Sequence, residues 1–296
     1  ALGVSRYELD FRLLQKAREL GVQVLEGCRT TGIVIRQNRV DRIHCLDSLN
    51  RPFELRSNFF VDATGRQRVL GKLADKELGF GSGNRKVQQV AFKTHFSDVR
   101  LSRGVCEMYF FRGGYGGLNY VENKTANHCF LIESKIAREF KGNADSILSE
   151  VIFENVRARE TMTGAKKKFD WLAVAVDTYG RQRQSIAENL VSVGDAGAFI
   201  DPFTGSGMLM ALESASILAE SLLTQRERLK FQDAAAIKKE YERKYRSSIR
   251  KRMVVCSVLR NLARSEAFVE LAMLALESNR RFLKRLTTMT RPAGTL

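Results

Sequence analysis

The segment from Leu190 to Ser221 limits the possible fold more than any other part of the chain. A short, mainly apolar run ends in Gly194-Asp195, a glycine-rich turn follows, and a helical stretch of small residues completes the segment. This order predicts a buried strand, a turn and a long helix. The Asp195 carboxylate is then expected at the carboxyl edge of a sheet, where α/β proteins bind their ligands.

The predicted turn permits close approach of a ligand. Residues 196–198 are alanine and glycine, so a flat or extended molecule can come near the backbone. Pro202 fixes a bend, and Gly205-Ser206-Gly207 opens the helix. Because the first N–H groups of a helix are free and its dipole is positive there, this point favours anionic atoms.

This run resembles the second flavin motif of FAD-dependent oxidoreductases with the para-hydroxybenzoate hydroxylase fold, in the branch of the geranylgeranyl reductases and flavin-dependent halogenases. In that family the aspartate binds the ribityl hydroxyls of the flavin, and the Pro-x-x-Gly-x-Gly turn lies against the isoalloxazine ring. The resemblance implies FAD as cofactor and assigns contacts with it to Asp195, Pro202, Gly205, Gly207 and Met208.

Two more segments resemble motifs of the same family, in the expected order. Val61–Arg66 (VDATGR) matches the middle motif, so the backbone of Thr64 and Gly65 is expected near the FAD diphosphate or adenosine. Arg68 stands about where the family has serine, which leaves the local contact open. Near the start, an S-R-x-x-L-D entry to a helix makes Arg6 the match for an arginine that often reaches the flavin; alone, Arg6 would be a solvated first-turn residue.

The βαβ unit that carries G-x-G-x-x-G in this fold is not found. Gly79–Gly83 has the wrong spacing, and Gly113–Gly117 lies between strand-like runs. Two interpretations remain open. The chain is a piece of a longer flavoprotein, or it is a natural short paralogue that has lost flavin binding.

Hydrophobic periodicity predicts a mixed α/β (α+β) fold. Helices are expected over 9–20 and 137–159, strands over 22–25, 32–35, 40–46, 53–61 and 171–176, and at least four antiparallel strands between 87 and 134. With the resemblance, this predicts a partial FAD-binding Rossmann-like domain with an inserted antiparallel substrate sheet. The predicted domains are 1–80 with 172–224 for FAD, 81–171 for the substrate, and 225–296 as a basic helical C-terminal region.

The antiparallel segment supplies the candidate substrate contacts. In the family this sheet forms one wall of the cavity in front of the flavin, which assigns Phe111, Tyr115 and Tyr120 to the substrate. An ordinary core position is the alternative for any one of these aromatic residues. The four glycines of Gly113–Gly117 indicate close backbone approach or a hinged loop. No residue is assigned as catalytic, as expected where the cofactor carries the redox chemistry.

Positive charge is concentrated at the C-terminal end. The chain has a formal net charge of +16, and residues 225–296 hold eighteen lysine and arginine residues against seven aspartate and glutamate residues, a net charge of +11. Three helices are expected here, over 231–250, 253–262 and 267–286. Basic and apolar residues together indicate either a solvated helical cap or contact with a membrane surface or lipid substrate. No nucleic-acid-binding motif accompanies the charge, so nucleic acid is not expected.

Cysteine and histidine usage indicates a reducing compartment and no metal. The five cysteines and three histidines are scattered, without CxxC or metal-ligand spacing. We therefore expect free thiols, a cytoplasmic location and no bound metal. No run of about 18 apolar residues predicts a membrane span.

Together these features predict an FAD-dependent oxidoreductase. NAD(P)H is expected to reduce the flavin, which passes a hydride to an apolar unsaturated substrate, isoprenoid or polyketide-like. The first alternative is a flavin-dependent monooxygenase or halogenase; the W-x-W-x-I-P motif of halogenases needs two tryptophans, and the chain has only Trp171. The second alternative is a non-catalytic basic protein, at a membrane surface or as a scaffold, on a degenerate flavoprotein fold. Substrate, electron donor and oligomeric state stay open.

Overall fold

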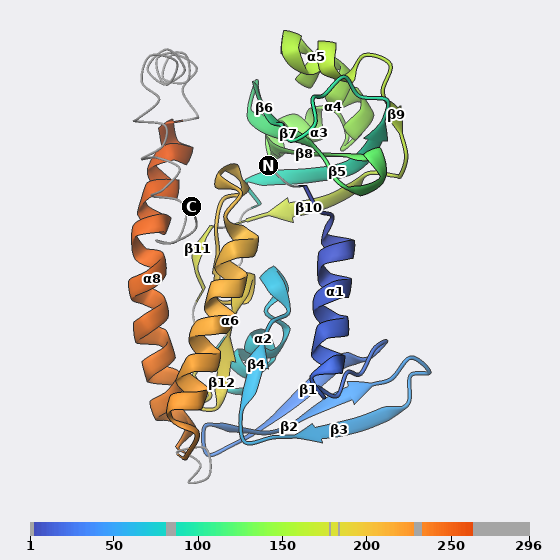
Figure 1. Cartoon of the computed structure of the whole chain (residues 1–296). Helices are drawn as coiled ribbons and strands as arrows, with labels where there is room; N and C mark the ends of the chain where they lie inside the picture. The colour runs from blue at the N-terminus through green and yellow to red at the C-terminus, as the bar shows by residue number, and fades with distance from the viewer. Residues whose placement is uncertain (1–2, 81–86, 178, 183, 228–232, 263–296) are drawn as a thin grey trace. The chain divides into compact units, whose positions relative to one another are not determined.

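The chain forms two compact units (Figure 1). The computed structural model describes residues 3–80, 87–177, 179–182, 184–227 and 233–262. Unit 1 combines residues 1–24 with 85–178, and unit 2 combines residues 25–84 with 179–296. Both units contain helices and strands, which confirms the mixed fold class predicted from the sequence.

Unit 1 is built on an antiparallel sheet with the strand order β10-β5-β8-β7-β6, and a short strand β9 pairs with β5. Phe92 pairs with Phe130 in the centre, and the two rings stack with centroids 5.0 Å apart. The antiparallel strands expected between 87 and 134 are therefore confirmed. These are β5 (Gln89–Ser97), β6 (Cys106–Phe111), β7 (Gly114–Tyr120) and β8 (Ala126–Glu133), and the sheet also contains β9 (Lys166–Lys167) and β10 (Leu172–Val176).

Three short helices pack on one face of this sheet: α3 (Ser134–Glu139), α4 (Ala144–Glu150) and α5 (Val156–Met162). The single helix expected over 137–159 is wrong. Gly142 has a left-handed φ of +73°, and the side chains of Asn143 and Asn155 accept hydrogen bonds from Ser146 N (3.0 Å) and Ala158 N (3.1 Å). Each asparagine caps a new helix, so the run is divided.

Helix α1 (Arg6–Glu19) opens unit 1. Ser5 caps it by accepting a hydrogen bond from Glu8 N (3.1 Å), and Gly21 follows its end with a φ of +81°. The strand expected over 22–25 is wrong, because this segment forms no ladder. Val22 and Leu25 are exposed, so the run has no sheet against which to bury its apolar side chains.

Unit 2 contains a meander and a parallel strand pair. The meander has the order β1-β2-β3, and β12 pairs in parallel with β4. Helix α2 packs beside them, and Phe60, Leu70 and Leu190 belong to their common core. The bounds are β1 (Arg29–Arg36), β2 (Arg39–Leu46), β3 (Pro52–Arg56), β4 (Phe60–Asp62), α2 (Val69–Glu77), β11 (Gly180–Arg181), β12 (Leu190–Ser192) and β13 (Ala198–Phe199).

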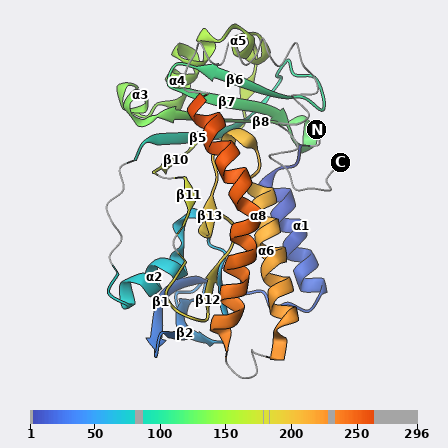
Figure 2. The same cartoon turned by 90° about the vertical axis from the view of Figure 1, so that its left-hand side faces the viewer.

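Two long helices complete unit 2: α6 (Gly207–Thr224) and α8 (Ala234–Leu262), which lie side by side in both views (Figure 2). The break expected between residues 250 and 253 is wrong, because no glycine or proline interrupts α8. The helix expected over 267–286 lies outside the described residues. Among those described, α6 is long and apolar enough to cross a membrane, with a mean hydropathy of 1.2. It packs against α8, and 22% of it is buried, at Met210, Ser214, Leu218 and Ser221.

Candidate functional site

Two glycine turns meet at one edge of unit 2. Strands β4 and β12 run in parallel register, with Ser192 opposite Asp62, so their carboxyl ends lie side by side. The single-turn helices that follow them, η1 (Gly65–Gln67) and η4 (Gly194–Ala196), are in contact. Val193 N donates a hydrogen bond to Asp62 O (3.0 Å) and joins the two chain segments. Two sequence motifs more than 120 residues apart therefore form one surface.

The turn after β12 requires its glycines. Gly194 has a φ of +57°, and a Cβ there would lie 3.3 Å from the Cβ of Ala211. Its N–H donates to Ser214 Oγ (2.8 Å), which links the turn to α6. At Gly197 a Cβ would lie only 2.8 Å from the carbonyl oxygen of Ser192. These glycines shape the turn and leave the Asp195 carboxylate, which is half-buried, as its functional group.

Replacing Gly194 with alanine is expected to destabilise unit 2 by about 1–2 kcal/mol, because an L-residue is strained at a positive φ. The crowding against Ala211 adds to this cost. Urea unfolding of the Gly194→Ala variant measures the change. Gly205→Ala is the matched control, because Gly205 has nearly the same positive φ (+62°) but a Cβ there would meet no atom within 4 Å. Equal losses in the two variants would contradict the packing contribution.

A buried aspartate shapes the turn after β4. The Asp62 carboxylate is fully buried and accepts hydrogen bonds from Thr64 N (3.0 Å), Thr64 Oγ1 (2.5 Å) and Gly71 N (2.8 Å). Thr64 Oγ1 in turn accepts from Val69 N (2.8 Å). Asp62 is therefore an internal support of the turn, a role that the sequence did not reveal. Arg68, the departure from the family pattern, is buried, and its Nη2 lies 3.4 Å from Asp75 Oδ2.

The third turn precedes α6. Pro202 begins a single turn, η5 (Pro202–Thr204), and the Asp201 carboxylate accepts from Phe203 N (3.0 Å). Gly205 has a φ of +62°, and a Cβ there would meet no atom within 4 Å. Gly207 is the first residue of α6, and Met208, which is 43% exposed, is the second. The backbone of this turn therefore faces open space at the positive end of a long helix.

Planar side chains extend the same region. The Arg66 guanidinium lies 4.9 Å from the centroid of the Phe199 ring, and Tyr179 stacks on Phe199 with ring centroids 5.4 Å apart. Arg66 belongs to the motif after β4, and Phe199 follows the motif after β12. Phe199 and Tyr179 could not be singled out from the sequence, because nothing in their local pattern distinguishes them from core residues.

These residues fit an FAD molecule. A Cβ at Gly65 (φ +65°) would meet no atom within 4 Å, as at Gly205, so two glycine backbones face open space. Asp195 supplies a carboxylate beside them, and the hydroxyl of Tyr245 on α8 is a buried polar atom without a hydrogen-bond partner among the described residues. Asp195 would hold hydroxyl groups of the cofactor, and the N-terminus of α6 would face its anionic part. FAD supplies hydride-transfer chemistry when it is bound.

The remaining predicted residues lie in unit 1. Arg6 is exposed in the first turn of α1 and forms an ion pair with Asp10 (2.8 Å). Phe111 and Tyr120 pack against the core on the helix-covered face of the sheet, and the Tyr120 hydroxyl donates to Val99 O (2.9 Å). Tyr115 alternates with these positions and lies on the opposite face, which we call the second face. The glycines from Gly114 onward are part of β7 and not a loop.

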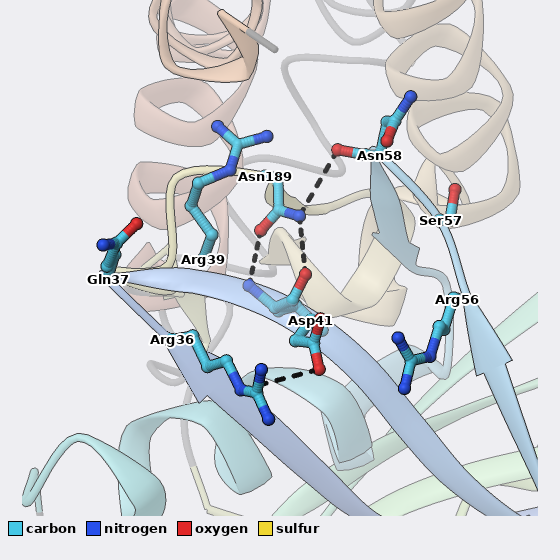
Figure 3. A pocket seen from close by; sticks show the side chains of 9 residues that line it. Arg36, Gln37, Arg39, Asp41, Arg56, Ser57, Asn58 and Asn189 are labelled. Carbon is cyan, nitrogen blue, oxygen red and sulfur yellow. Dashed lines mark hydrogen bonds and ion pairs between the residues drawn. The ribbon is translucent and has the colours of Figure 1, made fainter.

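A separate cavity of about 750 Å³ lies at the amino ends of β4 and β12, away from the glycine turns (Figure 3). Asn189 stands at its base and is buried. Its side chain accepts a hydrogen bond from Val40 N (2.7 Å) and donates to Val40 O (2.9 Å) and Asn58 O (3.3 Å). Arg36 and Asp41 are 3.8 Å apart at the rim. Through these hydrogen bonds the Asn189 amide joins the meander to the parallel strand pair.

Asn189→Ala is expected to destabilise unit 2 by about 3 kcal/mol, because three hydrogen bonds, two of them buried, are lost together. Asn58→Ala is the control, since only the backbone carbonyl of Asn58 takes part in this contact. Chemical denaturation of both variants gives the comparison. An Asn189→Ala variant as stable as the wild type would show that the meander is held by its apolar contacts alone.

The chain is similar to known flavin-dependent halogenases and to digeranylgeranylglycerophospholipid reductases. Residues 154–255 match the family model of the tryptophan halogenases. Digeranylgeranylglycerophospholipid reductase 1 of Methanococcoides burtonii is 25% identical over 252 residues, covering 83% of this chain and 57% of that protein. A flavin-dependent halogenase of Armillaria mellea is 26% identical over 254 residues, covering 75% of this chain and 46% of that protein. The chain thus spans about half the length of these relatives.

Solved structures share the fold. A flavin-dependent brominase superposes with a TM-score of 0.76 at 18% identity, covering 97% of this chain and 70% of that one. A geranylgeranyl bacteriochlorophyll reductase-like protein of Thermoplasma acidophilum gives a TM-score of 0.69 at 16% identity, covering 96% and 75%. The fold is that of the flavin-dependent halogenases and geranylgeranyl reductase-like proteins. The resemblance found in the sequence is confirmed: the chain has homologues in both groups, which are flavin-dependent enzymes.

Proposed function

We propose that the complete protein is an FAD-dependent oxidoreductase. The observation that carries this is the meeting of the turns after β4 and β12 at one sheet edge, where Asp195 lies beside exposed glycine backbone. Asp195 binds cofactor hydroxyls, the turn from Pro202 to Gly207 lies against the flat ring system, and the α6 N-terminus stabilises negative charge on it. Thr64 and Gly65 contact the diphosphate or adenosine side.

We further propose a reductase that acts on an apolar, unsaturated substrate with NAD(P)H as electron donor. The apolar side chains on the second face of the unit 1 sheet favour the proposal of an apolar substrate. It presents Met108 (40% exposed), Leu172 (67%) and Val174 (46%), with Tyr115 on the same face. The digeranylgeranylglycerophospholipid reductases among the relatives are named for a lipid substrate of this kind. In this proposal, Tyr115 contacts the substrate.

A halogenase or monooxygenase is the second candidate, and the tryptophan halogenase match over 154–255 favours it. Trp171, the only tryptophan, has a structural role in unit 1. Its Nε1 donates to Asp145 Oδ1 (2.8 Å), and its ring lies 5.4 Å from Phe130. With a single tryptophan in the sequence, the paired-tryptophan motif of halogenases is incomplete in this chain. Oxygen consumption coupled to substrate turnover would favour this candidate over the reductase.

The visible absorption spectrum of the complete protein, before and after anaerobic NADPH, tests the proposal. Visible flavin absorption bands that bleach with NADPH are expected. A flavin that another donor reduces but NADPH does not would contradict only the choice of donor. A colourless protein that takes up no added FAD would overturn the cofactor proposal and favour the non-catalytic alternative.

A cytoplasmic location with contact to a membrane surface also stays a proposal. Much of the apolar face of α8 is buried in unit 2, at Tyr241, Tyr245, Ile249 and Cys256, as expected for a helical cap. Among the described side chains of α8, Val254 (57% exposed) and Val258 (50%) are apolar and exposed, so they can contact lipid. Co-sedimentation with vesicles of anionic phospholipid tests the contact, and loss of binding is expected for Val254→Asp with Val258→Asp. Binding that these changes leave intact would contradict it.

A further inference from the structure

The cavity at the amino ends of β4 and β12 is lined almost entirely by polar and charged side chains (Figure 3). Its volume of about 750 Å³ is in the range of small-molecule sites, and it lies at the opposite ends of these strands from the glycine turns. Of the nine described residues that line it, only Val40 is apolar. An apolar ligand would remove the polar side chains from water without replacing their hydrogen bonds, so the lining favours a charged, hydrophilic ligand.

Arginines face each other across the strands of the meander beside this cavity. Arg36 on β1 is opposite Arg39 on β2, and Arg42 on β2 is opposite Arg56 on β3. Like charges directly opposite each other on neighbouring strands destabilise a sheet. Three of these four arginines line the cavity, so both unfavourable pairs lie at the same end of the meander. An anion bound in the cavity would offset this repulsion.

Asp41 is the only carboxylate among the described lining residues, and it does not balance the three arginines. It accepts a hydrogen bond from Arg42 (3.2 Å), which is outside the lining, and it lies 3.8 Å from Arg36, beyond hydrogen-bond distance. Figure 3 shows Arg36 and Arg56 reaching toward Asp41 from opposite sides. The side chain of Arg56 forms no ion pair or hydrogen bond within the described part of the chain. Its guanidinium is therefore available to a ligand.

We propose that this cavity is a second binding site, for a phosphate-bearing ligand that Arg36 and Arg56 hold through its phosphate. The planar guanidinium forms paired hydrogen bonds with phosphate oxygens. The side-chain amides of Gln37 and Asn58, which also have no partner among the described residues, can donate to further oxygens of the ligand. A soluble phosphate compound and a phospholipid headgroup share this chemistry. The site is independent of the proposed cofactor.

Calorimetric titration of the complete protein with inorganic pyrophosphate, at constant ionic strength, tests this site. Arg56→Gln is expected to weaken binding about tenfold, because charge-assisted hydrogen bonds are lost. The thermal midpoint of this variant without ligand is expected to be unchanged or higher, since Arg42 loses a repulsive neighbour. Asp41→Asn is expected to tighten binding about threefold, because the competing carboxylate is removed. Arg29→Gln is the matched control: it removes the same charge from β1, outside the lining.

Co-sedimentation with phosphatidylcholine vesicles, with and without phosphatidic acid, identifies the source of the phosphate. Binding to the phosphatidic acid vesicles that Arg56→Gln abolishes would support the site with a lipid headgroup as its ligand. Pyrophosphate binding without vesicle binding would support the site with a soluble phosphate compound. No binding of either probe, pyrophosphate binding that Arg56→Gln leaves unchanged, or equal losses in Arg56→Gln and Arg29→Gln would overturn the proposal.

Discussion

Asp195→Ala is expected to weaken FAD binding by about 100-fold or more in the complete protein. The variant loses the carboxylate that would accept hydrogen bonds from cofactor hydroxyls, and two charge-assisted bonds contribute about 3 kcal/mol together. Flavin content after purification and fluorescence titration measure the loss. The FAD affinity of Asp195→Asn is expected to lie between those of the wild type and Asp195→Ala, because an amide oxygen still accepts hydrogen bonds.

Asp41→Ala is the matched control for this experiment. Asp41 lies in the same unit, at the rim of the cavity beside the amino ends of the strand pair. The control is expected to retain its flavin. Unchanged flavin occupancy in Asp195→Ala would refute the assigned role of this carboxylate.

Unit 1 is expected to lose about 3 kcal/mol of stability between pH 7 and pH 4 through His128 alone. Its imidazole is fully buried among Phe96, Phe130 and Trp171, and Nδ1 lies 3.1 Å from Gly117 O. Burial lowers the pKa of His128 from 6.5 to about 4. Below pH 6.5 His128 becomes protonated in the unfolded chain but stays neutral in the folded unit. The free energy of unfolding therefore decreases as the pH is lowered, until the pH reaches the pKa of His128 in the folded unit.

Trp171 is a suitable probe for this measurement, because it is the only tryptophan and its ring lies 6.1 Å from that of His128. Urea unfolding followed by tryptophan fluorescence at several pH values gives the slope. Replacement of His128 with phenylalanine is expected to reduce the slope by about one proton between pH 4 and 6.5. His44→Gln, in unit 2, is the control. An unchanged slope in His128→Phe would assign the acid sensitivity to other groups.

The glycine turns after β12 and before α6 could be predicted because their backbone requirements are local. Gly194 and Gly205 have positive φ values, and Pro202 begins a turn, so these residue types appear in the sequence wherever such a backbone is built. The role of Asp62 could not be predicted. A carboxylate that supports a turn from inside has the same sequence pattern as one that binds a ligand, and only its burial separates the two.

The residues predicted to contact a substrate show a different limit. The alternation of apolar and polar residues predicted the strands of unit 1, but it did not predict which face of the sheet the helices would cover. Tyr115 and Tyr120 are five positions apart on β7 and therefore lie on opposite faces, and Phe111 shares the helix-covered face with Tyr120. The covered face depends on the helices that pack later in the chain. That information is not local to the strands.

Strands β4 and β12 contact each other through only three residue pairs, yet residues 85–178 are inserted between them in the sequence. When β4 pairs with β12, residues 85–178 of unit 1 form the loop that this pairing closes. The entropy of closing a loop grows with the logarithm of its length, so doubling the insertion costs only about 0.6 kcal/mol. The inserted sheet can therefore be enlarged, shortened or exchanged at little thermodynamic cost. A unit built like unit 2 can therefore carry very different inserted sheets without being rebuilt.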